Sequence, residues 1–312
     1  MRSVAVVGAT GAVGAVLRSI LRERGIENVR YFASSRSAGT ELEGIAIEEA
    51  TADALARAGV EVAFFAVGAS ASRALVPHAV RGGAVAIDKS SAWRMEPGVP
   101  LVVPEVNGAR AAEHDGVVAV PNCSTIQLVC ALKPLHDAAT LRRVRVATYQ
   151  SVSGAGGAAI ERLRAETVDQ HDLRADWDFD GEEFEEEAKI REETRKILEL
   201  PDLPVQATCV RVPVLVGHLE AVWVETESPL SPADAREILA AAPSVRLEEV
   251  PSPAKAAGVD DVLVGRIRRD PTVEQGLAFM VAGDNLRKGA ALNGVQIAEL
   301  LFEHSAPAHA AA

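Results

Sequence analysis

The sequence has few aromatic and cysteine residues, and it has no long hydrophobic run. Aromatic residues make up 4% of the 312 positions, whereas hydrophobic residues make up 48%, so alanine, valine and leucine must build most of the core. No apolar run reaches the roughly 20 residues of a membrane span. The N-terminus enters a strand pattern without the apolar segment of a signal peptide. These absences predict a globular, cytoplasmic protein that does not enter a membrane.

Basic residues are also scarce. Lysine and arginine total 32 against 44 aspartates and glutamates, a net charge of −12, which argues against nucleic acid or an anionic membrane as a partner. The three cysteines are widely spaced, so we expect reduced thiols and no disulfide framework. No cluster of histidine and cysteine has the spacing of a metal site, so we expect no metal. An anionic substrate would need basic residues placed locally.

A glycine-rich turn between a strand and a helix opens the chain. Positions 4–7 form an apolar strand pattern, positions 8–14 read GATGAVG, and helical periodicity follows from position 16. The glycines permit a tight turn and close approach of the backbone, and the N-terminus of the helix can receive a pyrophosphate. This context predicts a dinucleotide site. Its expected contacts are Gly8, Thr10, Gly11, Ala12 and Val13.

The second strand pattern, at positions 29–33, ends in a hydroxyl-rich segment with one arginine. A cofactor without a 2′-phosphate usually meets an acidic residue at this strand end. Here the chain has Ser35, Arg36 and Ser37 instead, which favours NADP. The alternative is that Arg36 is an ordinary surface arginine.

The alternation of strands and helices continues through the first part of the chain. Apolar strands at 60–67 and 83–88 flank a helical pattern at 70–81, which is typical of a parallel doubly wound sheet. Longer strand patterns, at 144–150 and within 205–224, appear later.

We therefore predict an α/β protein of two domains. A Rossmann-type parallel doubly wound nucleotide-binding domain spans 1–126 and is completed by a C-terminal helix at 286–305. A second, α+β domain for substrate binding and dimerisation spans 127–285.

A lone thiol, Cys123, stands where an apolar strand pattern gives way to a helical one. The free N–H groups and the dipole at a helix start favour the thiolate, which attacks carbonyl carbon. The alternative is a small apolar residue in a turn. A thiol needs a base, and His218 is the only one of seven histidines in a strand-rich, glycine-flanked context. Arg211 lies seven residues earlier, so both can line one site only if the chain turns between them, near Pro213 and Gly217.

Ten stretches, in order, resemble the aspartate-semialdehyde dehydrogenase family over nearly the whole chain. In that family a cysteine thiolate attacks the aldehyde, a hydride passes to NADP, and phosphate releases the acyl-enzyme as aspartyl 4-phosphate, on the route to lysine, threonine and methionine. The resemblance implies the same activity, with aspartate semialdehyde, aspartyl phosphate and inorganic phosphate as substrates, and a homodimer or higher homo-oligomer. The stretches are GATGAVG, SSRSAG, SSAWRM, VVPEVN, PNCSTIQ, ALKPLHDA, TYQSVSGAG, EETRKIL, RVPVLVGH and DNLRKGAALNGVQIAEL.

By the same resemblance, Cys123 is the nucleophile, His218 the acid/base and Gln150 the residue that positions the acyl group. Further roles carry over by motif. They are Arg211 for the substrate carboxylate, Glu186 for its ammonium, Arg94, Asn122 and Lys189 for phosphate, and Ser153, Gly154 and Asn285 for the cofactor.

The chain departs from the family pattern in one region and at one position. The segment 169–186 is markedly shorter than in the family, which puts the roles of Glu186 and Lys189 and a dimer contact in question. The alternative for Lys189 is a solvated residue that pairs with an acid one turn away on the same helix. Most acids in the run 176–187 are expected to be solvated. Lys89 stands where asparagine is usual. The rival functions are N-acetyl-glutamyl-phosphate reductase and a catalytically silent nucleotide-binding paralogue with an assembly or regulatory role.

Overall fold

The computed structural model describes residues 3–166 and 173–304. The chain divides into two compact units, one made of Met1–Pro121 with Ala291–Ala312 and the other of Asn122–Ala290. The expected division lay at 126/127 and 285/286. The ends of the expected first domain, at 1–2 and 305, and positions 169–172 of the short segment lie outside the described residues.

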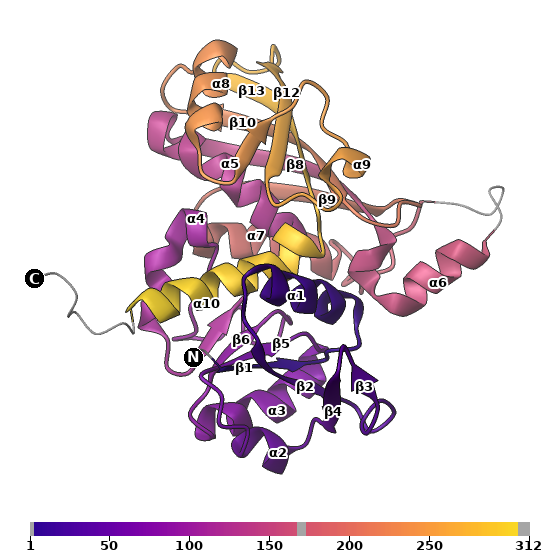
Figure 1. Ribbon diagram of the computed structural model, residues 1–312. Helices are drawn as coiled ribbons and strands as arrows, with labels where there is room; N and C mark the ends of the chain where they lie inside the picture. The colour runs from indigo at the N-terminus through magenta and orange to yellow at the C-terminus, as the bar shows by residue number, and fades with distance from the viewer. Residues whose placement is uncertain (1–2, 167–172, 305–312) are drawn as a thin grey trace, which may run out of the picture. The chain divides into compact units, whose positions relative to one another are not determined.

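The first unit is built on a seven-stranded sheet with the order β3-β4-β2-β1-β5-β6-β7 (Figure 1). Every neighbouring pair is parallel except β3 with β4, which confirms the predicted parallel doubly wound sheet. The strands are β1 (Ser3–Val7), β2 (Asn28–Ala33), β3 (Glu41–Leu42), β4 (Ile45–Glu49), β5 (Val62–Phe65), β6 (Val85–Asp88) and β7 (Val117–Ala119). The helices of this unit are α1 (Ala12–Glu23), α2 (Ala52–Ala56), α3 (Ala69–Arg81), α4 (Pro104–Asn107), the 3-10 helix Gly108–Glu113 and α10 (Asn293–His304).

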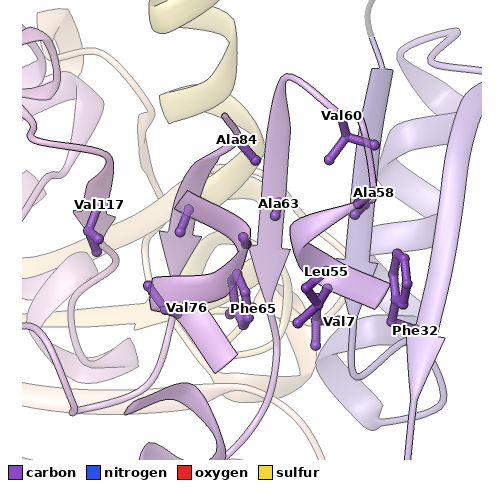
Figure 2. Close-up of a cluster of buried hydrophobic side chains, with 13 residues drawn as sticks. Val7, Phe32, Leu55, Ala58, Val60, Ala63, Phe65, Val76, Ala84 and Val117 are labelled. Atoms are coloured by element: carbon purple, nitrogen blue, oxygen red, sulfur yellow. The ribbon is translucent and has the colours of Figure 1, made fainter. Parts of the chain in front are cut away.

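Apolar side chains from neighbouring strands form the core of this unit on the face covered by α2 and α3 (Figure 2). Phe32 of β2 and Phe65 of β5 are at most 1% exposed, and they belong to one cluster with Leu55 of α2 and Val76 of α3. Because strand residues alternate between faces, the continuous apolar runs of β1 and β5 bury both faces of the sheet. The sheet is thereby held rigidly enough to fix the loops that follow its strands.

The last helix, α10, completes the first unit. Its Val295 and Ile297 are fully buried, and a Cβ at Gly294 would lie 3.6 Å from Ile87 of β6. At its start, the Asn293 side-chain amide donates to the Val102 carbonyl at 2.9 Å. The expectation that a closing helix belongs with the N-terminal sheet agrees with this packing.

The second unit contains a six-stranded sheet with the order β11-β12-β13-β10-β8-β9. Its central strand β10 is antiparallel to both neighbours, whereas β8 and β9 are parallel. The strands are β8 (Leu141–Gln150), β9 (Val205–Arg211), β10 (His218–Thr226), β11 (Val245–Leu247), β12 (Val262–Arg269) and β13 (Gly276–Gly283). The helices are α5 (Cys123–Ala139), α6 (Gly157–Ala165), α7 (Glu185–Leu198), α8 (Pro232–Ala241), α9 (Pro253–Ala256) and the 3-10 helix Val152–Ala155. A π-helical turn, Arg287–Leu292, begins in this unit and ends in the first.

One face of this sheet is buried against α5 and the other is not fully covered. On β10, Val222 and Val224 are buried, while Ala221 and Trp223, which point to the opposite face, are half-buried. Alternation of this kind is typical of an antiparallel sheet with one packed face. Within the part of the chain that the structure describes, no helix is long and apolar enough to cross a membrane.

Candidate active site

The Cys123 thiol is the first residue of α5, and it faces an imidazole from the central strand of the second unit. Its Sγ lies 3.1 Å from Nε2 of His218, the first residue of β10. The thiol is partly exposed, whereas the other two cysteines, Cys130 and Cys209, are buried. A thiol beside an imidazole at a helix N-terminus is the arrangement expected of an activated nucleophile.

Three hydrogen bonds hold the turn that carries the thiol. Asn122 caps α5, because its side-chain oxygen accepts from the Ser124 N–H at 2.8 Å. The Asn122 backbone N–H donates to Glu193 of α7 at 2.6 Å, and its side-chain amide donates to Glu186 at 2.8 Å. Both glutamates are at most 5% exposed. The helix α7 thus supplies two buried carboxylates that fix the residue next to the nucleophile.

The second imidazole nitrogen of His218 determines which tautomer is present. Its Nδ1 accepts from the backbone N–H of Ser151 at 3.0 Å, so in the neutral ring the hydrogen must be on Nε2, the atom that faces Cys123. His218 is fully buried. Burial lowers the pKa of the imidazole to about 3, and the positive charge of Arg211 adds to this effect. At neutral pH the ring is therefore uncharged and donates toward the sulfur.

Asn285 ties the small-residue loop after β8 to the start of β10. Its side-chain oxygen accepts from the Ser151 hydroxyl at 2.9 Å and from the Gly217 N–H at 2.8 Å, and its amide donates to Ser153 at 2.8 Å. The loop also needs glycine at position 154. A Cβ there would lie 3.2 Å from the Arg211 guanidinium and 3.4 Å from the His218 ring, so both side chains can approach the loop closely.

Gln150 and Lys189 are connected through the same carboxylate. Gln150 is 1% exposed and its amide donates to Glu186 at 2.8 Å, on the oxygen that also accepts from Asn122. The other Glu186 oxygen lies 3.8 Å from the Lys189 ammonium, which pairs with Glu185 at 2.7 Å. Glu186 is therefore not one of the solvated acids of its run, and Lys189 forms the helix pair of the alternative reading.

Arg211 and His218 both reach the loop that contains Gly154, although they end and begin different strands. Arg211 is the last residue of β9 and His218 the first of β10, and β8 lies between these strands in the sheet. Gly217 has φ +93°, a left-handed conformation that glycine adopts readily. The turn expected between the two residues is confirmed. Arg211 is only 4% exposed, and one end of its guanidinium donates to the Ser151 carbonyl at 3.1 Å.

The glycine turn of the first unit fits a dinucleotide. Gly8 has φ +89°, and a Cβ there would lie 2.4 Å from the Ala66 carbonyl oxygen. A Cβ at Gly14 would lie 2.2 Å from the Gly8 carbonyl oxygen. Gly11 is the N-cap of α1 and provides no side-chain cap, so the first N–H groups of α1, near Thr10, Ala12 and Val13, have no intrahelical partner. Close packing by glycine and free N–H groups suit a pyrophosphate.

The remaining expected residues of the first unit lie after β2 and β6. Ser35 and Arg36 are exposed in the turn after β2, where Ser37 donates its N–H to the Ser34 carbonyl. Arg94 is 8% exposed and its guanidinium donates to the carbonyls of Val120 at 3.0 Å and Lys89 at 2.7 Å. The latter contact uses only the backbone of Lys89, so the unusual residue type there does not affect it.

Sequence reasoning did not identify several polar residues that pack within the second unit. Glu193 supports Asn122, Ser151 orients His218, and Glu220 lies two residues after His218 on β10 and is fully buried. Burial raises the pKa of the Glu220 carboxyl well above its usual range, with only the Gln127 amide opposing. The only sequence signal for Glu220 is its spacing from His218, His-x-Glu on a strand, which places the two side chains on the same face of the sheet. Among residues 3–166 and 173–304, no group of three or more potential metal ligands is gathered.

Two family models match the chain. The one described as semialdehyde dehydrogenase, NAD binding domain, matches residues 3–114. The one described as semialdehyde dehydrogenase, dimerisation domain, matches residues 132–178 and 175–288. Fold and site thus define a semialdehyde dehydrogenase of two domains.

Comparison with individual proteins identifies the family within the semialdehyde dehydrogenases. The chain is 46% identical to the aspartate-semialdehyde dehydrogenase of Streptomyces akiyoshiensis, over 96% of this chain and 98% of that protein. It resembles the crystal structure of aspartate semialdehyde dehydrogenase II complexed with ASA from Vibrio cholerae, with a TM-score of 0.92, 38% identity, and coverage of 98% and 99%. A structure of the Candida albicans enzyme with NADP has a TM-score of 0.76 and 25% identity, covering 97% and 98%. The chain belongs to the aspartate-semialdehyde dehydrogenase family.

Proposed function

We propose that the protein interconverts L-aspartate 4-semialdehyde and L-aspartyl 4-phosphate, with NADP as cofactor and phosphate as co-substrate, through a thioester on Cys123. The observation that carries the proposal is the 3.1 Å approach of the Cys123 sulfur to His218 at the N-terminus of α5. Membership of the family supports the same reaction. Of the two rival functions, N-acetyl-glutamyl-phosphate reductase acts on a different substrate, and the silent nucleotide-binding paralogue has no turnover.

In the phosphorylating direction the Cys123 thiolate attacks the aldehyde carbon. The nicotinamide cofactor, when bound by the glycine turn, would supply the hydride acceptor that converts the adduct to a thioester. His218 presents its Nε2–H to the sulfur, and the same N–H reaches the oxygen of a tetrahedral adduct, so it stabilises negative charge as charge develops. Phosphate then attacks the thioester carbon, and the sulfur leaves as a thiolate that the Nε2–H again stabilises. With Nδ1 occupied by the Ser151 N–H, a donor role for His218 is better supported than proton removal at Nε2.

The two ends of the substrate need opposite charges around the thiol. Arg211 offers a guanidinium fork to the α-carboxylate, and Glu186 offers a buried carboxylate to the α-ammonium. Gln150 donates to the same carboxylate and would position the acyl group. This division of labour is consistent with an amino-acid aldehyde and does not suit N-acetylated glutamate semialdehyde, which lacks the ammonium.

For phosphate we propose Arg94, Asn122 and Lys189 as ligands, with unequal weight. Arg94 is buried and its guanidinium is oriented by the carbonyls of Val120 and Lys89, and a planar guanidinium suits an oxyanion. Lys189 is engaged by Glu185, so its contribution is smaller. Arg94→Ala should raise the KM for phosphate strongly and Lys189→Ala weakly, both without effect on NADP binding. Equal effects would contradict this ranking, and a silent Arg94→Ala would contradict the proposed reaction.

We propose NADP and not NAD because of the turn at 35–37. The Arg36 side chain is exposed and has no acidic partner among the described residues, while serines flank it. Arg36→Ala should weaken NADPH binding by about 1.5–3 kcal/mol, the range for hydrogen bonds to charged groups, and leave NADH binding almost unchanged. Fluorescence titrations with both cofactors measure this, and equal losses would speak against a 2′-phosphate site.

We also propose a homodimer or higher homo-oligomer that buries the less covered face of the second unit's sheet. Tyr149, 39% exposed, is a large side chain on this face. The half-buried Trp223 and Met280 lie on the same face, Trp223 opposite Arg145 and Met280 opposite Ala221. Aromatic residues and methionine are enriched in interfaces between subunits. The match to a dimerisation domain supports the same conclusion.

One assay separates the three functions. Purified protein should reduce NADP only when both aspartate semialdehyde and phosphate are present, and Cys123→Ser should bind NADPH yet show no turnover. Turnover restricted to N-acetyl-glutamate semialdehyde would favour the reductase of that substrate. Nucleotide binding without turnover of either aldehyde would favour the silent paralogue.

A further inference from the structure

The Arg211 guanidinium is enclosed by two residues that the family resemblance did not point to. Its Nε donates to Asp176 at 3.2 Å, and its Nη2 lies 3.2 Å from the same carboxylate oxygen. The ring of Trp177 lies against the guanidinium, with 4.5 Å between the guanidinium carbon and the ring centroid. On the opposite edge, Nη1 donates to the Ser151 carbonyl at 3.1 Å. The Arg211 side chain is 5% exposed as a result.

These contacts leave a defined part of the guanidinium for a ligand. A guanidinium has five N–H groups in a fixed plane. The hydrogen bonds to Asp176 and Ser151 use one N–H on Nε and one on Nη1, and Nη2 lies at ion-pair distance from Asp176. At least one N–H therefore remains on each terminal nitrogen. The described residues offer no further hydrogen-bond acceptor to Arg211. One N–H from each terminal nitrogen of a guanidinium can match the two oxygens of one carboxylate.

The segment that carries Asp176 and Trp177 is itself anchored to Arg211. Arg174 and Arg211 exchange both backbone hydrogen bonds, at 2.9 and 2.7 Å. The Trp177 ring also packs against Phe184, with centroids 6.3 Å apart. Backbone pairing therefore places the segment beside Arg211, and the aromatic contact supports the indole.

This segment coincides with the point where the chain departs from its relatives. The dimerisation-domain model matches in two stretches that meet at residues 175–178. Asp176 and Trp177 fall inside that junction, so the family motifs give no role to either residue. In the sequence, Asp176 reads as the first of a run of solvated acids.

We propose that Asp176 and Trp177 are positioning residues for Arg211 that hold its free two-donor fork ready for the α-carboxylate of the substrate. The proposal rests on the proposed function, in which Arg211 binds that carboxylate. Asp176 contacts one edge of the guanidinium and so limits its rotation within its own plane. Trp177 stacks on the face of the guanidinium and so fixes the orientation of that plane. An ordered fork loses less conformational entropy on binding, and therefore binds the carboxylate more tightly.

The test is steady-state kinetics of the full-length protein in the phosphorylating direction. Asp176→Asn and Trp177→Ala should each raise the KM for aspartate semialdehyde roughly tenfold, as expected for loss of a charge-assisted contact. The kcat and the KM values for phosphate and NADP should stay close to wild type, which also shows that the variants fold. Trp177→Phe, which keeps an aromatic face, should restore most of the affinity. Asp178→Asn, on an exposed acid of the same segment, is the matched control.

Two further variants separate this proposal from the function on which it rests. Arg211→Ala should raise the KM for the semialdehyde, and Asp176→Asn should have no additional effect in that background, because Asp176 acts through Arg211. If Arg211→Ala leaves that KM unchanged, the proposed carboxylate site is wrong. If Arg211→Ala raises it but Asp176→Asn leaves it unchanged or lowers it, the positioning role alone is overturned; a lower KM would mean that Asp176 competes with the substrate for Arg211.

Discussion

At the scale of single residues, the three cysteines differ by environment and not by chemistry. Cys123 is partly exposed beside His218, whereas Cys130 is 3% and Cys209 2% exposed. Burial also raises the pKa of the Cys209 thiol, which disfavours its reactive thiolate.

We therefore expect iodoacetamide near neutral pH to label Cys123 first and to leave the other two thiols unmodified until the protein unfolds. Peptide mass spectrometry after short exposures gives the three rates. Labelling of all three at one rate in the folded protein would contradict the assignment of Cys123 as nucleophile.

The buried Glu220 predicts a pH-dependent stability. Its pKa is raised in the folded protein by burial, so the folded state holds a proton that the unfolded state releases above its ordinary pKa. The protonated Glu220 carboxyl contributes its full stabilisation at pH values below the ordinary pKa of glutamate. This stabilisation is lost as the pH rises toward the pKa that Glu220 has in the folded state. Glu220→Gln, a neutral isostere, should be more stable than wild type at pH 8 and similar to it near pH 4.

Urea unfolding at both pH values measures this difference. Glu182→Gln, at an exposed position, should show no such pH dependence. A Glu220→Gln variant that is less stable than wild type at pH 8 would mean that the carboxylate form is favoured in the folded state.

At the scale of elements, the start of α5 joins stability to reactivity. Asn122 caps the helix and also contacts Glu186. Asn122→Ala should cost about 0.5–2 kcal/mol of unfolding free energy, as for other caps, and should slow the labelling of Cys123. Ser231→Ala removes the cap of α8 and is the matched control: it should cost similar stability while the labelling rate stays at the wild-type value. If both variants slow the labelling of Cys123 equally, the lower stability and not the Asn122 cap accounts for the loss of reactivity.

The elements and the main site residues were predictable because their signals are local. The glycine turn, the strand-to-helix junction at Cys123 and the chain reversal before His218 each lie within a short stretch. The contact of Glu193 with Asn122 joins residues 71 positions apart, and that of Ser151 with His218 joins residues 67 apart. No periodicity encodes such contacts, because they depend on how α7 and the loop after β8 pack. Asp176 is exposed, as its acidic run predicts, but its contact with Arg211 was not predictable, since an acid in an acidic run shows no sign of a distant arginine.

At the scale of the whole molecule, the less covered sheet face predicts the oligomeric state. Trp223→Glu places a charge in the middle of this face, where it would be buried in a dimer without a partner. Sedimentation should show wild-type dimers or larger oligomers and a shift of the variant toward monomers. Val250→Glu changes another exposed apolar residue, 52% exposed and outside the strands, and should leave the oligomer intact. A monomeric wild type would overturn the proposed assembly.

The position of α10 also has a consequence for the order of folding during synthesis. The second unit is one continuous segment, whereas the first needs the helix at the end of the chain. A nascent chain thus completes its second unit before its first, the reverse of the common N-terminal-first order. Until α10 is synthesised, Phe64 and Ile87 lack the contact that Gly294 of this helix makes with them. The partly synthesised chain therefore carries apolar side chains on its first sheet that gain their cover only when α10 is made.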